Sequence, residues 1–81
     1  MRYIFLGNLC EPYNVECDSV IDAVDWFYMD ANGISIGFRP EYIIIRGVKI
    51  ARMKVVTRDL NKGYVYAVPF KSLSRLKHLI K

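Results

Sequence analysis

The run from Glu41 to Phe70 constrains the fold most, because three apolar stretches follow one another there with only short turn signals between them. The stretches read EYIIIR, VKIARMKVVTRDL and YVYAV. Runs of this length that are rich in β-branched and aromatic residues are typical of strands, and short connections join antiparallel neighbours. The sequence therefore predicts a sheet, and every other segment covers or extends it.

Two further strands are indicated before this run. Residues 2–7 are apolar on both faces, which is typical of an interior strand. In residues 34–39 apolar and polar residues alternate, as in a half-buried strand, and Pro40 ends that pattern. The segment between residues 7 and 17 contains turn formers and is expected to be an irregular loop.

Two helices complete the pattern. The first covers residues 18–31, capped by Asp18 or Ser19 and stopped by Asn32-Gly33, and the second covers residues 73–80 after a cap at Ser72. On the first helix the apolar arc, which we expect to face the core, comprises Val20, Ile21, Ala23, Val24, Phe27, Tyr28 and Ala31. We expect one α+β domain over residues 1–81, with an antiparallel-rich sheet of about five strands in the order β-α-β-β-β-β-α and both helices on one face.

Size and composition predict self-association. A chain of 81 residues buries only about 60–65% of the surface that its unfolded form exposes, yet 53% of these residues are hydrophobic. We therefore expect a homodimer. The apolar runs are far shorter than the ~20 residues of a membrane helix, and the apolar part of the first ten residues is too short for a signal peptide. This indicates a cytoplasmic protein that does not enter a membrane.

Charge is divided unevenly along the chain, whose net charge is +4. Residues 1–30 hold six acids and one base, whereas residues 31–81 hold eleven bases and two acids. A folded domain with this division has an acidic pole and a basic pole, so it can meet an anionic partner at one and a cationic partner at the other. The two poles could also complement each other within a dimer.

The basic residues of the longest strand are the strongest functional signal. Strict alternation fails once between residues 48 and 58, so we expect a β-bulge near Ala51 or Arg52. The bulge would bring four bases toward a common outward side: Lys49, Arg52, Lys54 and Arg58. Side chains of this kind on one sheet face are suited to phosphate groups.

The register of the following hairpin decides whether tyrosines join these bases. A four-residue loop over residues 59–62 would place Tyr64 and Tyr66 on the inner side. A type I turn over residues 60–63, with Gly63 in the left-handed position, would place Arg58 opposite Tyr66 on the basic side. We favour the second register, because only glycine adopts positive φ without strain.

Two short stretches resemble the signatures of the RNA recognition motif. Residues 4–9, IFLGNL, are similar to the first signature, which implies that Phe5 faces outward and stacks on a base. Residues 62–66, KGYVY, are similar to part of the second, which implies the same for Tyr64 and Tyr66. Val65 departs from the family's usual residue, and the expected order of helices and strands differs from the family's. We therefore do not assign the chain to it.

Catalytic and metal sites have little support. The two cysteines, Cys10 and Cys17, and the single His78 are too few for a structural zinc site, and we expect two ordinary thiols rather than a disulfide. A lone histidine beside lysines is typically solvated. No phosphate-binding glycine loop or nucleophile motif is present, so the sequence predicts neither an enzyme nor a cofactor.

Two functions of different classes remain. The first is binding of single-stranded RNA or DNA by a basic sheet face that carries Tyr64, Tyr66 and Phe5. The second is binding of a host protein, as a small adaptor or inhibitor of the viral or phage accessory kind, through an open sheet edge or an acidic patch. That patch comprises Asp22, Asp25, Trp26 and Met29. Trp26 could instead fold over the edge of the sheet.

Overall fold

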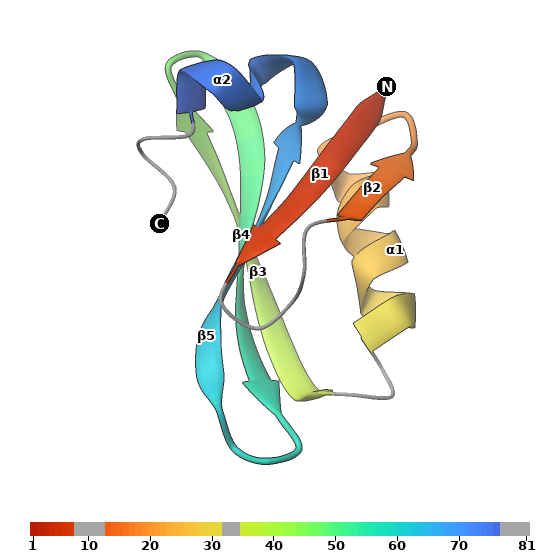
Figure 1. Cartoon of the computed structure of the whole chain (residues 1–81), viewed down its shortest axis with the longest axis vertical. Coiled ribbons are helices and arrows are strands. Elements are labelled where there is room, and N and C mark those ends of the chain that lie inside the picture. Colours follow the sequence, from red (N-terminus) through yellow and green to blue (C-terminus); the bar gives the residue numbers. More distant parts are fainter. Residues whose placement is uncertain (8–12, 32–34, 77–81) are drawn as a thin grey trace.

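The computed structural model describes residues 1–7, 13–31 and 35–76 (Figure 1). The elements, in chain order, are β1 (Arg2–Gly7), β2 (Tyr13–Glu16), α1 (Val20–Ala31), β3 (Ser35–Ile45), β4 (Val48–Thr57), β5 (Lys62–Pro69), the 3-10 turn η1 (Phe70–Ser72) and α2 (Leu73–Leu76). The five strands form one sheet in the order β2-β1-β5-β4-β3, and every neighbouring pair is antiparallel. The predicted α+β class is confirmed, as is the interior position of residues 2–7.

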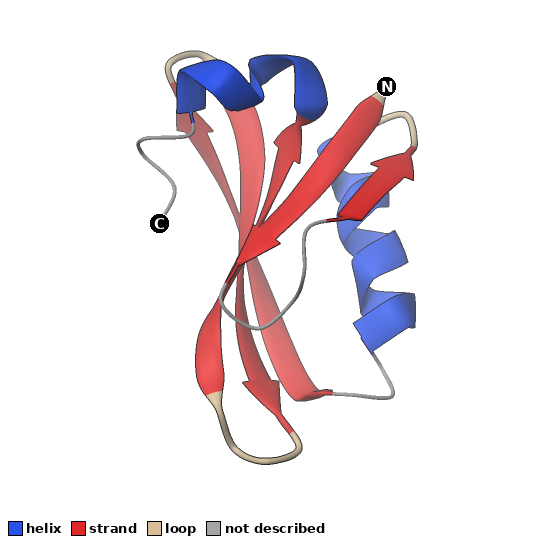
Figure 2. Cartoon of the chain, viewed as in Figure 1, coloured by secondary structure: helices blue, strands red, loops and turns tan. Residues whose placement is uncertain are grey.

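The order of elements differs from the prediction at two places. Residues 13–16 form the short strand β2, which pairs with β1, so a second strand precedes α1. Pro40 does not end a strand, because residues 35–45 form the single strand β3 (Figure 2). A proline is tolerated within β3 since this strand lies at the edge of the sheet, where its missing N–H need not pair.

One face of the sheet packs against α1 and is called the α1 face. Its buried side chains come from alternate positions of the central strands: Tyr3, Phe5, Ala51, Met53, Val55, Val65 and Ala67. They pack against Val20, Ala23, Val24 and Phe27 of α1. The rings of Phe5 and Phe27 stack with their centroids 5.3 Å apart. Ile21 and Tyr28 of the predicted helix core are exposed instead, so the apolar arc that α1 buries is narrower than expected.

The other face packs against α2 and is called the α2 face. Ile4, Ile50 and Val68 are buried there with Leu76 of α2, although their chain neighbours face α1. The prediction that both helices share one face is therefore wrong. The reason lies in β1, which is apolar on both sides, and in β4, whose apolar residues change face along the strand, so each helix meets a hydrophobic surface. In Figure 1, α1 runs along one side of the sheet while η1 and α2 cross its upper end.

Strand β4 contains no bulge at Ala51 or Arg52. Its pairing with β5 is continuous from Ala51 to Val56, and the one irregularity in its pairing with β3 lies between Ser35 and Gly37. The apparent break in alternation has another cause. Ile50 belongs to the core under α2, whereas Met53 belongs to the core under α1. The apolar positions change phase because the covered face changes along the strand.

The hairpin between β4 and β5 adopts neither of the two expected registers. Leu60 N–H donates to Thr57 O, Thr57 N–H donates to Asn61 O, and Leu60 has φ 66°. The turn is thus followed by a left-handed residue, as expected, but three positions earlier than Gly63. Arg52 consequently faces Tyr66, and Lys54 faces Tyr64.

Helix α1 begins where the sequence indicates. Ser19 precedes its first residue, and the Ser19 Oγ accepts a hydrogen bond of 3.2 Å from Asp22 N–H. This bond satisfies one of the donors that a helix start leaves open. The predicted helix over 73–80 is described only to Leu76, since residues 77–81, including His78, lie outside the described residues. Neither of these two described helices has the length and apolar character required to cross a membrane.

Candidate nucleic-acid interface

Basic side chains and tyrosines lie together on the half of the α2 face that is nearer the hairpin at residues 57–61. This basic surface is formed by Arg39 of β3, Arg52 and Lys54 of β4, and Lys62, Tyr64 and Tyr66 of β5. The pairings place them on one side, because directly opposed residues in antiparallel strands share a face. Lys54 is the centre, with Arg39 opposite on one neighbouring strand and Tyr64 opposite on the other.

Arg52 is the best-anchored base of this surface. Its Nη2 lies 3.3 Å from Glu41 Oε1, and its guanidinium carbon lies 5.4 Å from the centre of the Tyr64 ring. The hydrogen bond to Glu41 and the attraction of that carboxylate raise the pKa of Arg52 further. Its Nε is buried and has no hydrogen-bond partner among the described residues. Arg52 therefore stays charged, and its buried Nε donor is unsatisfied within the described part of the chain.

Tyr64 and Tyr66 differ in what surrounds them. Tyr66 packs against the core under α2, whereas Tyr64 lies nearer the hairpin and lines a shallow hollow. That hollow is also lined by Lys54, Val55, Val56, Lys62 and Gly63. It combines an aromatic ring with two ammonium groups at a half-exposed place. A nucleotide whose nucleobase stacks on Tyr64 would have its phosphates near both lysines.

Three of the predicted nucleic-acid residues lie elsewhere. Phe5 is 0% exposed and stacks on Phe27, so it is a core residue and cannot meet a base. Lys49 pairs with Ile44 on the α1 face, where its Nζ lies 5.9 Å from the Tyr42 ring centre. Without the bulge, the odd-numbered Lys49 points away from Lys54. Arg58 lies in the hairpin turn rather than on the sheet.

Two bases of the surface, Arg39 and Lys62, were not among the predicted site residues. Arg39 was missed because the strand was expected to stop at Pro40. Lys62 was missed because both expected registers placed it in the turn. Alternation continued through Pro40 would have identified Arg39, since Arg39 and Glu41 then stand on one face with Ile43.

The predicted protein-binding residues also come together, on the outer side of α1. Asp22, Asp25, Trp26 and Met29 line a hollow with Glu16, Cys17 and Asp18. Trp26 is 49% exposed, so it is not folded away over the sheet edge. This acidic hollow lies along the helix that covers the α1 face, so it is separated from the basic surface by the thickness of the sheet. The predicted division into two poles thus has a structural counterpart.

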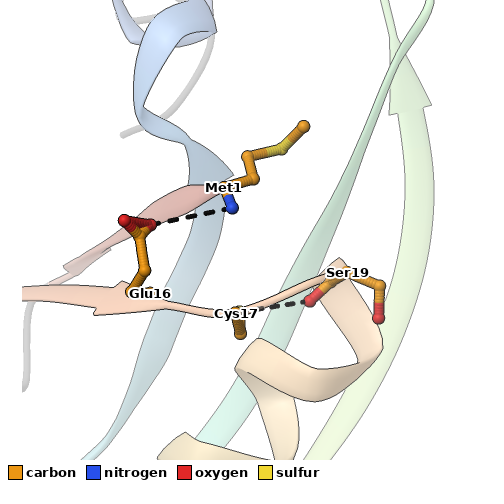
Figure 3. Close-up of polar contacts among 4 residues, drawn as sticks. All are labelled: Met1, Glu16, Cys17 and Ser19. Atoms are coloured by element: carbon orange, nitrogen blue, oxygen red, sulfur yellow. Dashed lines mark hydrogen bonds and ion pairs between the residues drawn. The ribbon is translucent and has the colours of Figure 1, made fainter.

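Two residues that line the hollow, Glu16 and Cys17, make local contacts (Figure 3). Glu16 Oε2 lies 3.7 Å from the Met1 amino group, and the Cys17 thiol donates a 3.4 Å hydrogen bond to Ser19 O. Burial raises the pKa of the Cys17 thiol. Cys17 is a free thiol, while Cys10 lies outside the described residues. Within residues 1–7, 13–31 and 35–76, no group of three acidic, histidine or cysteine side chains is placed to hold a metal ion.

Comparisons with known proteins give no family. No protein-family model matches the chain, and searches of curated proteins and of solved structures found no match.

Proposed function

We propose that the protein is a non-enzymatic nucleic-acid-binding protein that holds single-stranded RNA or DNA on the basic surface. One observation supports this most: the register of β3, β4 and β5 gathers Arg39, Lys54, Lys62 and Tyr64 on one sheet face. Lysine and arginine groups attract the phosphate backbone, and an aromatic ring accepts a base of any sequence. Single strands are the suited class, because bases must be unstacked to reach a tyrosine on a sheet.

Salt dependence tests the electrostatic part of this proposal. If three bases neutralise phosphates, log K for a single-stranded oligonucleotide should fall against log salt with a slope of about −2. The double variant Lys54→Ala, Lys62→Ala should reduce the slope by about 1.4. A control with the same net charge is Lys49→Ala, Lys71→Ala, which removes bases from the α1 face and from η1. The control should keep the slope.

The stacking part is tested by Tyr64→Ala. Its affinity should fall by about 1–3 kcal/mol with an unchanged salt slope, because stacking releases no counterions. Fluorescence anisotropy with a labelled oligonucleotide measures both quantities. The proposal is wrong if the wild type shows no salt-dependent binding. It is also wrong if the control double variant weakens binding as much as the Lys54, Lys62 variant.

A second candidate function rests on the acidic hollow. A half-exposed tryptophan surrounded by carboxylates is suited to a cationic protein partner, because buried aromatic anchors dominate interface energetics. The chain would then act as an adaptor or inhibitor of the viral or phage accessory kind. Trp26→Ala should abolish capture of such a partner while leaving oligonucleotide binding unchanged. Pull-downs with and without nuclease treatment distinguish the two functions.

Self-association is supported as well, because several large apolar side chains are exposed, among them Ile21, Tyr28, Tyr42 and Ile44. We propose a homodimer, as the composition predicts.

A further inference from the structure

The backbone of β3 has hydrogen-bonding groups that point away from the sheet. Thr57 N–H donates to Asn61 O, on the β5 side of β4. The backbone N–H and C=O groups of a strand point to alternate sides from one residue to the next. Those of Met53, four residues before Thr57, therefore also point toward β5. Met53 is opposite Pro40 of β3, so the backbone of Pro40 is directed away from β4. A proline fits this position because no N–H is needed there for pairing with β4. Tyr42 and Ile44 then direct their N–H and C=O groups out of the same open edge.

The side chains at these positions are apolar and exposed. Ile44 is 72% exposed, and Tyr42 is exposed beside it on the α1 face, since its partner Ala51 belongs to that core. Proteins normally protect an open edge with charges or by keeping it short. The opposite edge follows this rule, because β2 has four residues, carries exposed Asn14 and Glu16, and is fastened at Glu16 (Figure 3). The side chains of Tyr42 and Ile44 give the β3 edge no such protection, although Pro40 and Glu41 directly precede them.

We infer that β3 pairs with β3 of a second copy of this chain, antiparallel, about a two-fold axis at Ile43. In this register Tyr42 of each copy is opposite Ile44 of the other, and both pairs are of the hydrogen-bonded kind. Each pair exchanges two backbone bonds, which gives four. Both exposed side chains are then covered by a cross-strand aromatic and β-branched contact. The edge is thus complementary to itself.

Pro40 disfavours one of the neighbouring registers. An axis at Tyr42 would place Pro40 opposite Ile44 of the second copy, and the missing N–H would leave an Ile44 carbonyl unpaired. With the axis at Ile43, Glu41 is opposite Ile45, so no like charges face each other within residues 41–45. The assembly is isologous and closes as a dimer.

The dimer also arranges the basic surfaces. A two-fold axis through an antiparallel strand pair stands perpendicular to the sheet, so equivalent faces of the two copies lie on the same side. The ten-stranded sheet carries both basic surfaces on one side and both α1 helices on the other. The inference itself does not depend on nucleic-acid binding.

Cysteine cross-linking tests the register. In a background with Cys10→Ser and Cys17→Ser, Ile43→Cys should give a covalent dimer under mild oxidation. Residues facing each other in a non-hydrogen-bonded pair have Cα atoms about 4.5 Å apart, within the range of a disulfide. Ile44→Cys should not cross-link, because the two copies of residue 44 are displaced along the strands. Efficient cross-linking of Ile44→Cys but not Ile43→Cys would overturn the register.

Sedimentation equilibrium tests the interface without any cross-link. Ile44→Lys should abolish the dimer, since it introduces a charge at the paired edge. Tyr42→Pro should raise the dimer Kd by about tenfold or more, because it removes two of the four bonds without affecting pairing to β4. Leu60→Lys is the matched control: Leu60 is 68% exposed but lies at the hairpin, so its dimer should persist. A wild type that stays monomeric, or a dimer that survives Ile44→Lys, would refute the inference.

Discussion

The two faces of the sheet are made by the same strands, yet the helix on one face covers more of the central strands than the helix on the other. The α1 face joins residues from β1, β4, β5 and a three-turn helix into one apolar cluster. The α2 face is apolar only under η1 and α2, and toward the hairpin it carries charges and Tyr64. This difference shows how a small domain can build most of its core on one face while part of the other face stays exposed.

The largest loss of stability is expected from a substitution in the core of the α1 face. Phe5→Ala removes a fully buried ring that stacks on Phe27, so the free energy of unfolding should fall by about 3–5 kcal/mol. Tyr64→Ala on the other face should cost about 1 kcal/mol or less, since its site is half-exposed. Urea unfolding followed by circular dichroism measures both. Equal losses of unfolding free energy in the two variants would contradict the view that the α1 face contributes more to stability.

A second change acts at Gly7, where β1 lies close to the backbone of β5. A Cβ at Gly7 would collide with the Tyr64 carbonyl oxygen and the Val65 Cα, which are backbone atoms that cannot turn away. Gly7→Ala should therefore destabilise the protein by about 1–3 kcal/mol. The matched control is Gly37→Ala, because nothing lies within 4 Å of a Cβ there. If both variants have the same midpoint in urea, the close approach has no energetic weight.

A stabilising change is expected at the hairpin, next to the open half of the α2 face. Leu60 has φ 66°, a conformation that costs a residue with a Cβ about 1–2 kcal/mol. Leu60→Gly relieves this strain but adds freedom to the unfolded chain, so a net gain of about 0.5–1 kcal/mol is expected. Leu60→Ala keeps the Cβ and should show no gain. Thermal unfolding distinguishes the two variants.

The smallest expected effect is a loss of stability at alkaline pH, and it arises from groups on the α1 side. Desolvation raises the pKa of Tyr3, Cys17 and Tyr42, all of which lie on the α1 side. The folded state holds these protons more tightly than the unfolded chain does. Stability is therefore full below the ordinary pKa values of 9.0 and 10.0 and is lost as pH rises through the raised ones. Urea midpoints should decline above about pH 9, and Cys17→Ser should remove part of the decline. A constant midpoint would contradict this.

Local patterns predicted the elements better than their mutual placement. Apolar runs located β1, β4 and β5, and the Ser19 cap located α1, because these signals are contained in a few neighbouring residues. The helix faces could not be predicted, since β1 is apolar on both sides and the apolar residues of β4 change face along the strand, so either face could accept a helix. Strand β2 was missed because its four residues include Asn14 and Glu16 beside turn formers.

The candidate site was predicted only in part, because its residues depend on the register between strands as well as on local patterns. Arg52, Lys54, Tyr64 and Tyr66 do share one face, but through a register that was not expected. Gly63 was the residue suited to positive φ, yet Leu60 adopts it. No local feature favours leucine there, so the continuous pairing of β4 with β5 determines the turn. Phe5 was misplaced because a strand that is apolar on both sides does not reveal which side meets α1.

The position of β1 between β2 and β5 has a consequence for synthesis on the ribosome. Tyr3 pairs with Val15 on one side and with Pro69 on the other, so β1 leaves the ribosome long before β5, one of its two partner strands. Strands β3, β4 and β5 pair with sequence neighbours and close short loops, which form quickly. The β5 side of β1 therefore stays unpaired until translation reaches β5, and the core under α2 is completed only when Leu76 follows.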